Sequence, residues 1–157
     1  MDAAMREKII ALLDEHRILS LATVRPDGWP QATTVGYVND GMEIYFMCGR
    51  ESQKARNLAR DDRVSLTIDH DTSDPMAIHG LSMGARAVPV NDEAIFRRAM
   101  LELLPKKYPE YGPMMKEADL GQMMAFRLVP QVISVLDYSQ GFGHADMVQV
   151  EPEAIPA

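Results

Sequence analysis

Two short turn sequences constrain the fold of this chain more than any other feature. Residues 25–28 (RPDG) and 39–41 (NDG) each join two apolar runs rich in β-branched side chains, and Pro, Asp, Asn and Gly are typical of tight turns. The runs are 18–24, 31–38 and 42–48. Because such short connections join antiparallel neighbours, the sequence predicts three consecutive antiparallel strands at its start.

The third run leads into a short polar turn and then into a helix expected over residues 52–61. Ser52, Gln53 and Lys54 form the turn. Free N–H groups and the helix dipole favour an anion at a helix N-terminus, and a lysine adds a charge-assisted contact. The turn is therefore a candidate phosphate seat for a cofactor with a terminal phosphate. The alternative is an ordinary helix start, with Ser52 as the N-cap and Lys54 as a solvated first-turn residue.

More strands follow this helix. Residues 63–69 (RVSLTID) alternate between apolar and polar side chains and predict a fourth strand, and residues 77–90 predict one long strand or two. Gly80 and Gly84 indicate a bulge, a bend, or a close approach by a ligand or a second backbone.

The last strand segments are expected over 122–129 and 131–136. Pro130 between them marks a bend or a break, because proline has no N–H to donate to a ladder. The antiparallel order, without βαβ alternation, predicts a mainly β fold: a small barrel of six to seven antiparallel strands with peripheral helices.

Two longer helices are expected beside the strands. Residues 3–16 place apolar side chains at helical spacing and predict an amphipathic N-terminal lid. A second helix is expected to begin with Asn91 as its N-cap and to end at Pro105.

Length and composition narrow the organisation and the partners of the chain. Its 157 residues predict a single domain, with an N-terminal helix (1–17), a barrel (18–138) and a C-terminal tail (139–157). The net charge of −7 argues against nucleic-acid binding. No run is apolar enough for a membrane helix or a signal peptide, and the single cysteine has no disulfide partner. We therefore expect a cytoplasmic protein with no nucleic-acid or membrane partner.

Several segments, in their order, carry a resemblance to a known family. They are ILSLATVRPDGWP, PQATTVGYV, IYFMCGRESQK, NLARDDRVSLTID and IHGLSMGARAVPV, and DYSQGFGHADMV resembles an ending found in a bacterial branch. Over nearly its whole length the chain resembles the pyridoxamine 5′-phosphate oxidase-like split-barrel family of flavin-binding proteins. The resemblance implies a homodimer with two FMN sites at the subunit interface.

The resemblance also implies roles for individual residues. The turn and the strand end before it would hold the FMN phosphate, and the second strand would line the isoalloxazine with backbone groups. The implied cofactor residues are Thr33, Thr34, Val35, Met47, Cys48, Ser52, Gln53 and Lys54. The three residues of the second strand have an alternative role as ordinary β-formers in a barrel wall.

Some positions depart from the pattern of true oxidases in this family. Gln53 stands where those enzymes have an Arg, and Cys48 stands where they have a Thr. Both changes weaken the expected binding of the FMN phosphate, and the nearby Arg50 and Arg56 are candidates to restore it. The second strand also lacks the Arg and Lys of authentic pyridoxamine phosphate oxidases, so vitamin B6 oxidation is not expected.

The histidines and methionines predict no metal site. The histidines, at positions 16, 70, 79 and 144, are too scattered to form a recognisable metal motif, and His79 is expected to be packed or hydrogen-bonded. His144 belongs to a GFGH loop that could cover a ligand, and it is a further candidate cofactor residue. The methionines are typical core fillers rather than copper ligands.

The expected function is that of an FMN-dependent oxidoreductase acting on a small organic substrate. A flavin brings its own electron sink, so no catalytic acid or base is required and none is predicted. The alternatives are a non-catalytic protein that stores or senses flavin, and a deazaflavin- or haem-binding member of the same fold. The sequence does not specify the substrate, because this barrel hosts many activities.

Overall fold

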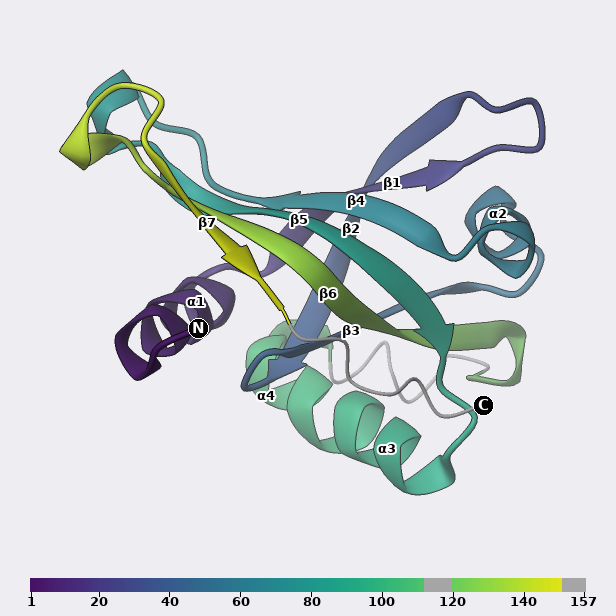
Figure 1. Cartoon of the computed structure of the whole chain (residues 1–157). Coiled ribbons are helices and arrows are strands. Elements are labelled where there is room, and N and C mark those ends of the chain that lie inside the picture. Colours follow the sequence, from purple (N-terminus) through teal and green to yellow (C-terminus); the bar gives the residue numbers. More distant parts are fainter. Residues whose placement is uncertain (112–119, 151–157) are drawn as a thin grey trace.

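The computed structural model describes residues 1–111 and 120–150 of the chain, and its main body is an antiparallel sheet that curls on itself (Figure 1). The strands run in the order β3-β2-β1-β4-β5-β6-β7, and a further pairing of β3 with β6 closes the first six into a barrel. The strands are β1 (Ile18–Val24), β2 (Pro30–Asp40), β3 (Glu43–Gly49), β4 (Arg63–Ile68), β5 (His79–Pro89), β6 (Met123–Asp137) and β7 (Ala145–Gln149). The predicted mainly β split barrel is confirmed.

The barrel forms because its strands alternate buried and exposed side chains. In β4, for example, Val64, Leu66 and Ile68 are buried and the residues between them are exposed. The core also holds Phe46 and Phe126, whose rings stack with centroids 5.4 Å apart. The N-terminal helix α1 (Ala3–Glu15) packs Ile9, Leu12 and Leu13 into the same core.

Glycines shape the sheet where the sequence indicated. Gly28 and Gly41 have φ angles of 85° and 61°, as the two tight turns require. A Cβ on Gly80 would lie 2.3 Å from the Ile68 carbonyl oxygen, so this glycine permits the close approach of a second backbone. The ladder between β5 and β6 shifts register between Gly84 and Ala85. Both predicted irregularities are therefore confirmed.

The remaining helices flank the strands. They are α2 (Gln53–Arg60), η1 (Pro75–Ala77), α3 (Glu93–Arg97), the π-helical η2 (Arg98–Leu103), α4 (Leu104–Lys107), η3 (Pro109–Tyr111), η4 (Leu120–Gln122) and η5 (Tyr138–Gln140). Among the described residues, no helix has the length and apolar character needed to cross a membrane.

Two predictions about the long helix were wrong. Asp92, not Asn91, is the N-cap, because its carboxylate accepts hydrogen bonds from the N–H groups of Ala94 and Ile95. The helix also continues past Pro105. Proline is tolerated there because it lies in the first turn of α4, directly after a π-helical stretch.

Two predictions about the last strands are refined by the structure. Of the bend or break expected at Pro130, the break is absent, because β6 is continuous and Pro130 lies at the register shift of the β5–β6 ladder, where the regular pattern of hydrogen bonds is already interrupted. The predicted C-terminal tail contributes a strand, β7, which pairs with β6. Its short sequence, ADMVQ, gives only a weak apolar pattern.

A lysine joins three elements on one side of the barrel. Lys107, at the end of α4, donates through Nζ to the Leu13 carbonyl oxygen at 2.7 Å and to Asn39 Oδ1 at 2.9 Å. The same ammonium lies 3.9 Å from the centroid of the Tyr37 ring. Burial lowers the pKa of Lys107 to about 8.

We expect this lysine to give the protein a pH-dependent stability. Because its pKa is lower in the folded chain than the 10.5 of a free lysine, the unfolded chain binds more protons between these two pH values. The free energy of unfolding should therefore rise with pH over this interval. Urea unfolding at a series of pH values measures this rise. It should be weaker in Lys107→Met and unchanged in Lys106→Met, a control that alters an exposed neighbouring lysine. The same pH dependence in Lys107→Met as in the parent protein would contradict the assignment.

Candidate functional site

The start of α2 leaves two backbone N–H groups without a partner among the described residues. Ser52 Oγ accepts a hydrogen bond from the Ala55 N–H at 3.1 Å, so Ser52 is an N-cap, as one interpretation of the sequence held. The N–H groups of Gln53 and Lys54 come before the first intrahelical bonds. This end of the helix can therefore still accept an anion.

Lys54 is a partly desolvated cation. Burial lowers its pKa, and the neighbouring Cys48 opposes that shift. Within the described ranges, no side chain or carbonyl forms an ion pair or hydrogen bond with its ammonium group. This environment differs from the solvated first-turn residue of the alternative interpretation, because a charge withdrawn from water favours a counter-charge beside it.

A buried asparagine that sequence reasoning missed fixes α2 against the barrel. Asn57 is fully buried, and its Nδ2 donates to Thr23 Oγ1 of β1 at 2.9 Å and to Gln31 Oε1 of β2 at 3.1 Å. Its Oδ1 accepts a hydrogen bond from Gln53 Nε2 at 2.8 Å. The side chain of Gln53 is therefore engaged with Asn57, and its backbone N–H remains for a ligand. The only sequence signal was a polar residue on the apolar face of a short helix, between Ala55 and Leu58.

The predicted residues of β2 lie where the barrel splits. β2 pairs with β3 only from Tyr37 to Asp40, whereas Thr33, Thr34 and Val35 pair with β1 alone. One edge of this part of β2 therefore carries backbone groups outside the ladder. The buried hydroxyl of Thr33 has no hydrogen-bond partner among the residues that the structure describes. A hydrogen-bonding group from outside the described residues, such as one on a ligand, would satisfy the Thr33 hydroxyl.

The predicted residues of β3 lie on the other side of the split. Met47 and Cys48 pair with Ala125 and Met124 of β6, directly before the chain enters α2. An apolar cavity of about 270 Å³ opens beside Met47. Its lining includes Gly36, Tyr37, Phe46, Met47, Met100 and Tyr108.

The two arginines that were candidates to compensate are held by backbone carbonyls. Arg50 Nε donates to the Gly121 oxygen at 2.8 Å, and Arg56 Nη1 donates to the Glu51 oxygen at 2.7 Å. Lys54 differs from these two arginines, because its ammonium group lies in the candidate phosphate seat and forms no hydrogen bond to a carbonyl oxygen among the described residues.

The structure does not bring His144 to the other predicted cofactor residues within one chain. His144 lies between β6 and β7, and its carbonyl oxygen accepts from the Asp137 N–H at one end of β6. The opposite end of β6, at Met123, pairs with Gly49 just before α2 (Figure 1). His144 Nε2 is buried without a hydrogen bond among the described residues and lies 3.4 Å from the Asp146 carboxylate.

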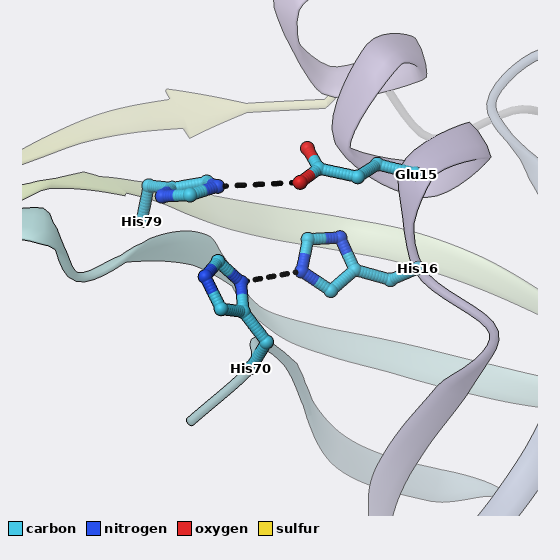
Figure 2. A group of neighbouring side chains, drawn as sticks. All are labelled: Glu15, His16, His70 and His79. Carbon is cyan, nitrogen blue, oxygen red and sulfur yellow. Dashed lines mark hydrogen bonds and ion pairs between the residues drawn. The ribbon is translucent and has the colours of Figure 1, made fainter. Parts of the chain in front are cut away.

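The other three histidines are separated in the sequence but lie close together in space. His16, His70 and His79 meet Glu15 at one end of the barrel (Figure 2). The cluster escaped sequence reasoning because its members come from α1, from the segment after β4 and from the start of β5.

Comparisons with known proteins agree with the fold. A family model described as pyridoxamine 5′-phosphate oxidase matches residues 5–137. General stress protein 26 of Bacillus subtilis (strain 168) is 30% identical over 67 residues. That match covers 43% of this chain and 47% of that protein, so it spans about half the length of this curated relative.

Solved structures resemble most of the chain. The conserved hypothetical protein Rv2991 from Mycobacterium tuberculosis is 26% identical with a TM-score of 0.74, and the match covers 99% of this chain and 95% of that one. HutZ, the haem storage protein from Vibrio cholerae, is 23% identical with a TM-score of 0.65, covering 82% and 92% respectively.

We expect Asn57 to be the main anchor of α2. Asn57→Ala should lower the free energy of unfolding by about 1–3 kcal/mol, because it leaves Thr23 and Gln31 without their amide partner. Asn91→Ala is the matched control, since Asn91 is exposed and is not the N-cap of its helix. Urea unfolding of both variants measures the effect. Equal free energies of unfolding for Asn57→Ala and Asn91→Ala would show that the hydrogen bonds of the Asn57 amide contribute little.

Proposed function

This chain belongs to the pyridoxamine 5′-phosphate oxidase family, and we propose that it binds FMN and acts as a flavin-dependent oxidoreductase on a small organic substrate. The observation that carries the proposal is the ammonium group of Lys54, which is partly buried at the N-terminus of α2 and has no counter-charge in the described part of the chain. A phosphate monoester would supply that counter-charge and accept hydrogen bonds from the free N–H groups of the helix.

The residues around the split of the barrel fit the rest of the cofactor. The Thr33 hydroxyl needs a polar partner, and the open edge of β2 offers further backbone groups. Flavin nitrogen and carbonyl groups can provide such partners. Bound FMN would supply the electron sink, while the protein would orient the ring and exclude water from one of its faces.

We also propose that two chains assemble and complete each cofactor site. In support of this proposal, Thr33, Thr34 and Val35 lie on an edge of β2 that β3 does not cover. Exposed apolar side chains, including Trp29 and Met147, offer surface for a second copy. Residence in the cytoplasm stays a prediction from the sequence.

Haem binding is the second candidate. HutZ, a haem storage protein, has the same fold, and His144 Nε2 is a buried imidazole nitrogen without a hydrogen bond among the described residues. An imidazole nitrogen of this kind is a common axial ligand of haem iron. FMN remains the first candidate because Lys54 and the N-terminus of α2 suit a phosphate.

The deciding experiment is an absorption spectrum of the protein after incubation with FMN and desalting, with the released cofactor identified by mass. We expect about one FMN per chain. Lys54→Ala should weaken FMN binding by roughly ten- to a hundredfold, because a hydrogen bond to a charged group contributes about 1.5–3 kcal/mol.

Arg60→Ala is the matched control, since it removes an exposed cation from the opposite end of α2. An affinity of Lys54→Ala equal to that of the parent protein would rule out the phosphate seat. A protein that retains haem and not FMN would favour the second candidate. Retained flavin that is reduced but passes no electrons to any acceptor would favour storage or sensing.

A further inference from the structure

Four side chains with metal-binding atoms meet where α1 reaches the barrel. Glu15 is the last residue of α1 and His16 its C-cap, while His70 follows β4 and His79 begins β5 (Figure 2). One donor atom of each residue lies within 4.8 Å of the donor atoms of the other three. The cluster lies outside the candidate cofactor site around α2 and β2.

The β4–β5 ladder explains why two of these histidines meet. In its register Ile68 pairs with Leu81, and the same register continued by two residues sets His70 opposite His79. Their ring centroids are 4.6 Å apart in an edge-to-face arrangement. His16 joins them from α1, and its Nε2 lies 3.2 Å from His70 Nδ1.

Backbone carbonyls fix the tautomers of two rings. His16 Nδ1 lies 2.9 Å from the Leu12 carbonyl oxygen, and His79 Nδ1 lies 3.0 Å from that of Ala77. Because a carbonyl oxygen only accepts, each Nδ1 carries the hydrogen. Each neutral ring then presents a lone pair on Nε2, as histidine ligands of metals do when their other nitrogen donates to the backbone.

The contact between His79 and Glu15 depends on the charge of the ring. His79 Nε2 lies 3.6 Å from Glu15 Oε1, so the two groups form an ion pair when the ring is protonated, whereas in the neutral ring a lone pair faces a carboxylate oxygen. A positive charge shared by the two groups would turn this opposition into attraction. A metal ion meets that need as a proton does, and it would also take the place of the hydrogen that His70 Nδ1 donates to His16 Nε2.

We propose that Glu15, His16, His70 and His79 form a binding site for a divalent transition metal ion, with zinc as the best match. Three imidazole nitrogens and one carboxylate oxygen suit zinc and its neighbours rather than calcium or magnesium. Ligand atoms around tetrahedral zinc lie about 3.3 Å apart, close to the 3.2 and 3.6 Å found between these pairs.

The surroundings give an ion a path to the site. An open groove of about 470 Å³ adjoins the cluster, and Glu15, His70 and His79 line it. Asp137 also lines this groove, but it is engaged by Lys8 at 2.8 Å and by Ser139 and Gln140. A bound ion would link α1 to the β4–β5 hairpin and so stabilise the folded chain by mass action.

The test is metal titration of tag-free protein that has been stripped with a chelator. We expect one Zn²⁺ per chain by calorimetry, and visible absorption of four-coordinate Co²⁺ when cobalt is the probe. His70→Ala and His79→Ala should each weaken zinc binding by at least about tenfold, because even the loss of an outer hydrogen bond to a ligand costs this much. Zinc should raise the melting temperature of the parent protein and have a smaller effect on the variants.

His144→Ala is the matched control, because it removes the one histidine outside the cluster. Glu15→Gln keeps the size of an exposed side chain while removing its charge, and it serves if a histidine variant does not fold. The proposal is overturned if the parent protein binds less than one ion per chain at micromolar zinc. It is also overturned if Glu15→Gln, and every variant of His70 and His79 that folds, binds zinc as tightly as His144→Ala does.

Discussion

The pairing of β3 with β6 is the interaction on which the rest of this structure depends. It joins residues 44–49 to 123–128 and turns an open sheet into a closed barrel. The same ladder stacks Phe46 on Phe126 in the core. It also ends β3 at Gly49, so that α2 begins beside the place where β2 and β3 separate. The candidate cofactor site is thus a consequence of how the barrel closes.

The buried polar groups near this split have different requirements. Asn57 satisfies its whole amide within the chain and holds α2 against β1 and β2. Lys54 and the Thr33 hydroxyl have no such partner among the described residues. Buried polar groups in folded proteins almost always find partners, so the Thr33 hydroxyl is suited to a ligand, whereas Asn57 is structural. The Lys54 ammonium is only partly buried, and it adds a positive charge to the same region.

The other end of the barrel has its own polar cluster. There α1 closes the core with apolar side chains and ends at Glu15 and His16, which meet the β4–β5 hairpin. The proposed anion site at α2 and the proposed metal site at Glu15 and the three histidines therefore lie in different regions of this barrel. The length of β6 separates the two ends, so a ligand at one need not contact the other.

The sequence by itself determined strands β1 to β4, their antiparallel order and the tight turns, because alternation and turn residues act over a few neighbouring positions. It also located the turn at Ser52, whose capping role is local. Only the tertiary structure decided that Pro130 lies at a register shift, that Asn57 is an anchor, and that three distant histidines share one space with Glu15. These features depend on strand register and on the packing of α1 and α2, which bring together residues far apart in the chain. No local sequence pattern predicts these contacts, because the residues meet only when the barrel has closed.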